Sequence, residues 1–209
     1  MAINVGERAV IATLQSAVSV FVANLATFVP DIYGQETTEH QAEITQWWQN
    51  SANNLTIRMG YVSAPVQGLS WNVVVGSSPE VSGRRVIGTY ASTSGGTITD
   101  GTTFSSSYHI GCLGVNQNWL LWSQMLCKWA LLYQRKTLEQ EYGLFDQSIS
   151  MTPLQPVPDD LKDAVAFAFM RGVSLSAQHF DTWSQLPVAT ITSATVGITP
   201  TFASVTVGG

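Results

Sequence analysis

The chain has few charged residues, and this scarcity restricts the functions that its surface can serve. Charged side chains make up 11% of the 209 residues, against a usual share of about 25% in soluble domains. The net charge of −5 gives no general attraction for nucleic acid, and the one tight basic pair is Arg84-Arg85. A surface with so few charges is suited to permanent contacts with other protein subunits.

Cysteine is nearly absent as well. The two cysteines, Cys112 and Cys127, have no CxxC spacing, which argues against both a metal site and a disulfide framework. We expect reduced, buried thiols, one in a strand and one in a helix.

The sequence signatures of enzymes are missing from the chain. There is no G-x-S-x-G elbow, no Walker glycine loop, no H-E-x-x-H and no cluster of metal-ligand residues. The three histidines, His40, His109 and His179, fall in unrelated predicted elements, with His109 on the outward face of a strand. Ser78 precedes the turn residue Pro79 and has no base at a plausible spacing. We therefore expect that the protein is not an enzyme and has no catalytic residues, cofactor or metal.

What the chain does contain is an unusual amphipathic helix, which we expect to end before Pro30. Apolar residues recur at helical spacing and predict a face buried in the core: Val10, Leu14, Ala17, Val18, Phe21, Val22, Leu25 and Phe28. The opposite face has small neutral residues where a solvated helix would carry Lys and Glu: Ala9, Ala12, Thr13, Ser16, Ser19, Ala23, Asn24 and Thr27. We interpret this face as a subunit contact, with Ser16, Ser19, Ala23 and Thr27 as its candidate residues.

The uncharged run over residues 9–30 is long enough to cross a bilayer. However, Gln15, Ser16, Ser19 and Asn24 lie off the apolar stripe, whereas a lipid-facing helix is apolar around its circumference. No basic region precedes a hydrophobic segment as it does in a signal peptide. We expect neither a membrane span nor a secretory signal.

The period of the sequence changes several times after this helix. A second short helix is predicted to start near Thr38 and to carry Trp47 and Trp48. Alternating apolar residues over 55–61 and 69–75, joined by the turn at 64–68, predict a β-hairpin. Residues 76–103 are mostly Gly, Ser and Thr, and we predict a long mobile loop in which Arg84 and Arg85 face a lumen or a partner.

Regular structure is predicted to resume with a strand that has Phe104, Tyr108, Ile110 and Cys112 on one face. A long helix over about residues 117–142 follows, capped by Asn116 and stopped by Gly143. It is predicted to be buried on two sides, with one narrow stripe facing water: Gln124, Lys128 and Arg135.

Two further strands are predicted, over residues 144–151 and 165–175, separated by Pro153, Pro156 and Pro158. Residues 189–207 are rich in Val, Ile and Thr and predict an extended arm that seeks a sheet edge, its own or a neighbour's. The sequence thus predicts an α+β domain over residues 1–186 and an arm over 187–209. Its antiparallel or mixed sheet of about four to five strands is packed by two main helices.

Several short stretches stand in a characteristic order along the chain. They are Arg58-Met59-Gly60-Tyr61, Leu69-Ser70-Trp71-Asn72-Val73-Val74-Val75-Gly76, Ser78-Pro79-Glu80, Ser107-Tyr108-His109-Ile110, Gly143-Leu144 and Arg171-Gly172-Val173-Ser174-Leu175. With the order of elements, they resemble the tail terminator and neck (head–tail connector) proteins of tailed bacteriophages, over about residues 5–183.

This resemblance implies a structural virion protein of the neck, made in the host cytoplasm. Such proteins form a ring, commonly of six copies, that caps the tail tube, stops its polymerisation and joins tail to head. The implied partners are further copies of the chain and neighbouring neck, tail-tube or sheath proteins. Genomic DNA passes without specific binding, to which the negative charge is suited.

Three alternatives stay open. One is another connector or tail component, of the stopper or head-completion type. A second is a carbohydrate-binding module, which would use exposed aromatic rings, although five of the seven tryptophans fall on predicted helices: Trp47, Trp48, Trp119, Trp122 and Trp129. The third is a hydrolase of low charge without a recognisable motif.

Overall fold

A computed structural model describes residues 3–50, 53, 55–60, 69–79, 86–88, 98–114, 116–156 and 169–185. For residues 3–5, 86–88, 98–102, 169 and 180–185 it describes the backbone alone. The chain divides into two compact units, one formed by Met1–Glu80 with Phe104–His179 and the other by Val81–Thr103 with Phe180–Gly209. The predicted arm and its boundary near residue 186 lie outside the described residues.

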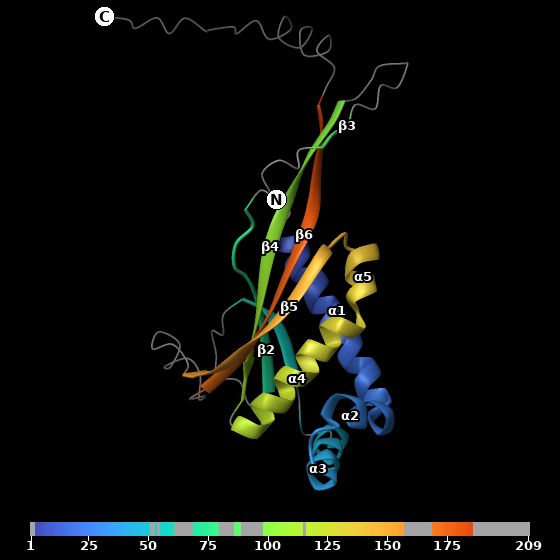
Figure 1. The fold of residues 1–209 in the computed structure, drawn as a ribbon, viewed down its shortest axis with the longest axis vertical. Coiled ribbons are helices and arrows are strands. Elements are labelled where there is room, and N and C mark those ends of the chain that lie inside the picture. The colour runs from blue at the N-terminus through green and yellow to red at the C-terminus, as the bar shows by residue number, and fades with distance from the viewer. Residues whose placement is uncertain are drawn as a thin grey trace, which may run out of the picture. The chain divides into compact units, whose positions relative to one another are not determined.

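The fold is α+β with a mixed sheet, as the sequence predicts. The strands are arranged in the order β1 (Leu55–Met59), β2 (Leu69–Val75), β4 (Ile98–Leu113), β6 (Phe169–Gln185) and β5 (Phe145–Pro156). In the first unit, α1 (Ile3–Ala23) packs on β1 and β2, and α4 (Gln117–Tyr133) packs on β2 and β5 (Figure 1). These two are the main helices that the sequence predicts.

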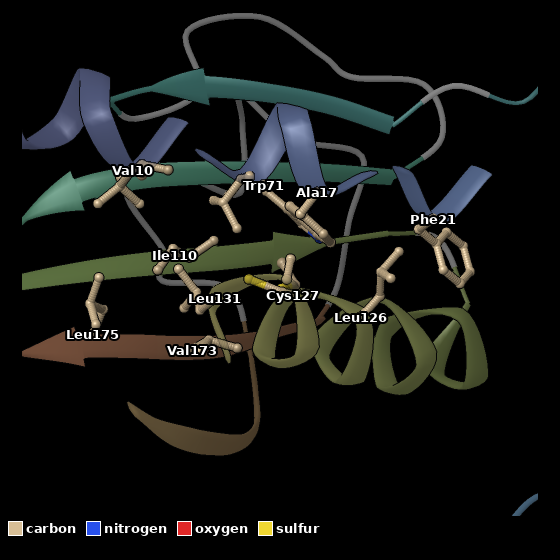
Figure 2. Close-up of a cluster of buried hydrophobic side chains, with 14 of the residues drawn as sticks. Val10, Ala17, Phe21, Trp71, Ile110, Leu126, Cys127, Leu131, Val173 and Leu175 are labelled. Carbon is tan, nitrogen blue, oxygen red and sulfur yellow. The ribbon is translucent and has the colours of Figure 1, made fainter. Parts of the chain in front are cut away.

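The core lies between these helices and the sheet (Figure 2). The side chains labelled there are almost entirely buried: Val10, Ala17, Phe21, Trp71, Ile110, Leu126, Cys127, Leu131, Val173 and Leu175. Trp71 satisfies its indole N–H by donating to Ser123 Oγ at 2.7 Å. The alternation over β4 is confirmed at Tyr108, Ile110 and Cys112, whereas Phe104 is half-buried.

The predicted hairpin is wrong, because β1 and β2 are parallel, with Leu55 beside Leu69 and Met59 beside Val73. A hairpin needs a tight turn, but residues 60–68 can span about 30 Å when extended. A strand of five residues is only about 17 Å long. The connection is therefore long enough to return the chain to the start of β1, and alternation alone does not distinguish the two directions.

The N-terminal helix is broken rather than continuous. It bends by 110° between α1 and α2 (Leu25–Tyr33). Asn24 leaves the helical conformation at φ −134°, and its side-chain amide donates to Val20 O at 2.9 Å. The expected end before Pro30 is also wrong, because Pro30 lies inside α2. Burial of Val29 and Tyr33 on either side of the proline outweighs the backbone hydrogen bond that it cannot donate.

The predicted faces of this helix are partly wrong. Val22, assigned to the core stripe, is 40% exposed, whereas Ala9 and Thr13, assigned to the opposite face, are buried. The short third helix is confirmed as α3 (Thr38–Gln49), and the side chain of Thr37 caps it by accepting from His40 N.

The loop predicted over residues 76–103 is wrong in part. In the second unit, β3 (Val86–Gly88) pairs antiparallel with the first residues of β4, Val86 lying beside Gly101. A strand of three residues is too short to show the periodicity by which strands are recognised. Arg84 and Arg85, the candidate lumen or partner residues, lie outside the described residues, as do 89–97.

The long second helix is confirmed with one break. Asn116 caps α4 by accepting from Asn118 N at 2.8 Å. The helix is interrupted at Gln134 and continues as α5 (Arg135–Gln140). Gly143 ends the helical region with φ +66°, a conformation that favours glycine. Gln124, predicted to face water, is instead 1% exposed, because its amide pairs with backbone groups of the sheet.

The proline cluster does not end the first C-terminal strand. β5 continues through Pro153 to Pro156 and pairs antiparallel with β6, with register shifts between Phe145 and Ser148 and between Thr152 and Gln155. Proline is tolerated because β5 is the last described strand on its side of the sheet. The start of the second predicted strand, residues 165–168, lies outside the described residues.

Candidate subunit interface

The candidate interface residues are exposed in the single chain but fall into two groups. Ser16, Ser19 and Ala23 are spaced by three and four residues on α1, so they share one stripe of its surface. Thr27 lies beyond the 110° bend, on α2. Two of the hydroxyls have hydrogen bonds: Ser19 Oγ donates to Gln15 O at 3.0 Å, and Ser16 Oγ accepts from Gln134 Nε2 at 3.3 Å.

Exposed apolar side chains occur on the same helical layer. Val22 of α1 is 40% exposed, and Leu132 and Tyr133 at the end of α4 are each 48% exposed. From Gly6 to Ala23 the only charged residues are Glu7 and Arg8, both in the first turns. Exposed apolar groups on a surface with few charges are typical of protein contacts. The sequence had a signal for Tyr133, since consecutive apolar residues at 131–133 cannot all share one helix face.

A row of aromatic rings joins α2 to the end of α4. The ring centroids of Phe28 and Trp129 are 4.9 Å apart, and those of Trp129 and Tyr133, which stack, are 4.8 Å apart. Phe28 and Trp129 are half-buried, and Tyr133 is exposed. The row therefore extends from the core to the surface and fixes α2 against α4.

The start of α1 is fixed on the sheet by two contacts. Glu7 Oε1 accepts from the backbone N–H of Val75 at 2.9 Å. Gly6 approaches Tyr108 so closely that a Cβ on residue 6 would overlap the tyrosine hydroxyl. A side chain at position 6 would push α1 away from β4, so the glycine sets their distance.

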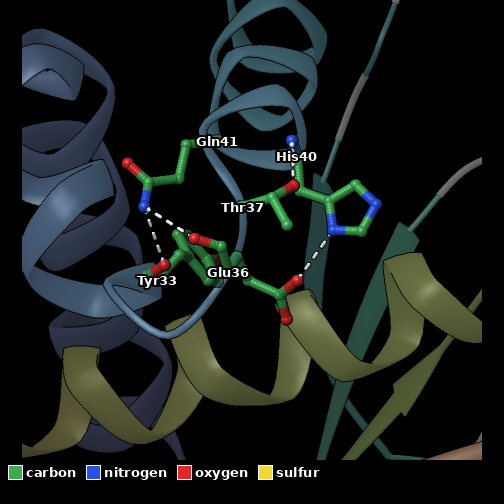
Figure 3. Close-up of polar contacts among 5 residues, drawn as sticks. All are labelled: Tyr33, Glu36, Thr37, His40 and Gln41. Carbon is green, nitrogen blue, oxygen red and sulfur yellow. Dashed lines mark hydrogen bonds and ion pairs between the residues drawn. The ribbon is translucent and has the colours of Figure 1, made fainter.

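The turn between α2 and α3 is held by local hydrogen bonds (Figure 3). Gln41 Nε2 donates to Tyr33 O at 3.1 Å and to Glu36 O at 3.2 Å, while His40 Nδ1 lies 2.9 Å from Glu36 Oε2. The hydroxyl of Tyr33 donates to Trp122 O at 2.8 Å inside the core, and burial raises the pKa of Tyr33 above its ordinary value. These contacts fix α2, and with it Thr27, relative to α4.

The amide of Gln124 fastens α4 to the sheet from inside. Its Nε2 donates to Thr152 O at 2.7 Å and to Gly172 O at 2.6 Å, and its Oε1 accepts from Arg171 Nη1 at 3.4 Å. One side chain thereby binds β5, β6 and the helix together. The outer surface of α4, including Leu132, is thus presented on a rigid support.

The structure also brings together polar residues that the sequence leaves in separate elements. Ser106 Oγ lies 2.7 Å from Ser78 Oγ and 3.2 Å from His179 Nδ1. A serine next to a histidine is the beginning of a nucleophilic site, but Ser106 is only 2% exposed. We interpret the group as a tie between β4, β6 and the segment after β2. His109 is exposed as predicted, with Nδ1 2.8 Å from Ser174 Oγ.

The two cysteines are free and buried, as predicted. Burial raises the pKa of Cys127, and its hydrogen bond with Cys112 raises it further, so the Cys127 thiol stays protonated and unreactive. Within the described parts of the chain, no three His, Cys, Asp or Glu residues are grouped so that they could hold a metal ion.

None of the helices in the described ranges is by itself long and apolar enough to cross a membrane; Gly6–Ala23 and Leu25–Tyr33 meet that criterion only as a pair bent by 110°.

Comparison with known proteins finds no family model and no curated protein that matches this chain.

Proposed function

We propose that this chain is a structural protein of the neck of a tailed bacteriophage, where copies form a ring, commonly of six, that caps the tail tube and joins tail to head. The observation that carries the proposal is the exposed, uncharged stripe of Ser16, Ser19 and Ala23 on α1, on the same helical layer as exposed Val22 and Tyr133. The resemblance of the sequence to neck proteins supplies the location in the virion.

The stripe supports an interface on physical grounds. Small side chains let a neighbouring backbone or ring approach closely, and an uncharged face loses little hydration when it is covered. Burial of the neighbouring apolar side chains, such as Val22 and Tyr133, then contributes favourable free energy of association. In this proposal the chain has no catalytic role and no cofactor, and DNA passes through the ring without specific contacts.

The carbohydrate-binding alternative has less support from the aromatic residues. Trp71 and Trp122 are buried, and the rings of Trp47, Trp119 and Trp129 pack against other aromatic rings. A sugar-binding platform needs a free flat ring face, whereas the ring of Trp129 stacks on Tyr133 and the rings of Trp47 and Trp119 make tilted or edge contacts with other tryptophans.

The test is the state of the purified full-length chain, measured by light scattering and by negative-stain electron microscopy. We expect a discrete ring-shaped oligomer, alone or on purified tail tubes, and an arrest of tube growth when the protein is added. A protein that stays monomeric at all concentrations and neither binds nor stops tubes would overturn the proposal.

A further inference from the structure

We propose that β1 is the acceptor for a strand from a second copy of the chain, and that residues 203–207 near the C-terminus supply this strand. The inference rests on the proposed ring and specifies one of its contacts. It starts from the two ends of the described sheet, where β1 and β5 are the edge strands.

The β5 edge is protected against the addition of a strand. Pro153 and Pro156 have no N–H with which to pair, and the two register shifts against β6 disturb the regular spacing of hydrogen bonds. Prolines and bulges of this kind are how proteins prevent pairing at sheet edges.

The β1 edge has none of these features. It pairs with β2 without interruption over all five residues and contains no proline. Its single charge, on Arg58, is directed across the sheet, where Nε donates to Asn72 Oδ1 at 3.0 Å. Every second residue of a strand paired on one side presents its N–H and C=O outwards.

The side chains of β1 are incompletely covered on the core side. Leu55, Ile57 and Met59 lie beside the buried residues of β2, yet Leu55 and Ile57 are only half-buried and Met59 is 44% exposed. On the other side of the sheet stand the polar residues Thr56 and Arg58. An added strand that fits would have small apolar residues on one face and polar residues on the other.

Residues 203–207 have this pattern, in the order Ala203-Ser204-Val205-Thr206-Val207. Ala203, Val205 and Val207 would extend the apolar face past Leu55 and Ile57, and Ser204 and Thr206 would continue the polar face. Residues 187–209 contain no charged side chain, so pairing would bury none. The five residues match the five of β1.

The donor and the acceptor belong to different parts of the chain. The donor segment follows β6, and β6 is separated from β1 in the sheet by β4 and β2. Contacts between two different surfaces of identical copies are head-to-tail, and they close into a ring when the rotation between copies allows it. One edge and one segment in each copy are sufficient for every contact of such a ring.

The test is disulfide cross-linking between two variants of the full-length chain that each carry one added cysteine. Thr56→Cys is mixed with Ser204→Cys or with Thr206→Cys under a copper–phenanthroline oxidant, which removes the two thiol hydrogens and electrons. Native Cys112 and Cys127 are buried, so we expect them not to form cross-links. We expect a cross-linked heterodimer in one mixture, and the pairing partner reveals the strand direction. Val205→Cys, which faces the other side, is the matched control and should not cross-link with Thr56→Cys.

The outcomes separate this inference from the proposed function. A protein that forms rings but gives no cross-link in either mixture overturns the β1 contact and leaves the ring standing. A double variant, Thr56→Cys with Ser204→Cys or Thr206→Cys, that cross-links within single chains at high dilution overturns the second-copy assignment. A chain that never associates overturns the ring itself. As a second measure, Val205→Pro should weaken association about tenfold or more, while Val205→Thr, which keeps the N–H, should not.

Discussion

Gln124 shows how one buried residue can fix a helix on a sheet. The residue is 1% exposed, and its side-chain amide donates to two backbone carbonyls and accepts a hydrogen bond from an arginine. We expect Gln124→Leu to reduce the free energy of unfolding by about 2–4 kcal/mol, because it leaves the carbonyls of Thr152 and Gly172 without their donor. Urea denaturation measures the change. Gln140→Leu, at an exposed position of α5, should change stability by no more than about 0.5 kcal/mol, and equal losses for the two variants would contradict the role of Gln124.

Tyr33 predicts how stability depends on alkaline pH. Burial raises the pKa of its hydroxyl above the ordinary value of 10.0, so the folded state favours the neutral phenol. This contribution to stability is fully present below about pH 10 and is lost as the pH rises through the higher pKa of the folded state. Tyr33→Phe should therefore reduce the steepness of the loss between about pH 10 and pH 11, by up to about 1.4 kcal/mol per pH unit. Parallel pH profiles for the two proteins, from urea unfolding, would refute this.

The sequence predicts the roles of many single residues correctly. It fails where the environment of a residue depends on contacts with residues far away in the chain. Asn116 and Gly143 were identifiable because caps and left-handed positions depend on local chemistry. The sequence predicts that Gln124 faces water, because polar residues are usually exposed, and nothing in the helix reveals that the backbone carbonyl of Gly172 lies within hydrogen-bond distance. A Cβ on Gly172 would lie 2.5 Å from Thr152 Oγ1, so the close approach itself depends on a distant glycine.

At the scale of elements, the stripe on α1 gives the sharpest test of the proposed interface. Ser19→Glu or Ala23→Glu would place an unpaired charge in the contact, at a cost of about 3–5 kcal/mol, and should abolish assembly while circular dichroism stays near that of the parent. Gln46→Glu, on an exposed position of α3, is the matched control and should assemble normally. If Ser19→Glu forms the same oligomer as the parent, the stripe faces solvent and the assignment is wrong.

Elements were predicted well where the pattern is periodic and poorly where connection or direction matters. α3 and α4 were identified from apolar spacing and cap residues. The parallel pairing of β1 and β2 was missed because alternation is the same in both directions, and β3 was missed because three residues are too few to show a period. The break at Asn24 has no local breaker residue such as proline, and after it α2 packs against α4.

For the whole molecule, the C-terminal segment provides the main prediction. Truncation after Leu186 should leave a soluble folded protein, because α1, α4 and the sheet together bury a shared set of apolar side chains. Assembly, or docking to a neighbouring neck component, should be weaker. Sedimentation of the full-length and truncated proteins side by side, with their incorporation into particles, measures both effects. Equal assembly would show that the segment is dispensable, and loss of folding would show that it completes its own domain.

The α+β class and the two-helix layer followed from the sequence because composition and period restrict architecture strongly. The division into two units did not follow from the sequence, because it is set by contacts between segments that are far apart in the chain. The candidate interface is intermediate: lack of charge indicates the α1 stripe in the sequence, whereas the exposure of Val22 and Leu132 is visible only in the structure.

The long-range contacts of α1 and α2 have a consequence for synthesis. Glu7 bonds a residue 68 positions later, and Tyr33 one 89 positions later. At translation rates of about 5–20 residues per second, the apolar side of these helices waits on the order of 10 s for α4 to emerge. During that time the core-facing stripe and the candidate contact stripe are both exposed. Only a chain that includes α4 hides the first stripe and leaves the second exposed alone, so a shorter nascent chain cannot display to its neighbours the surface that a finished subunit displays.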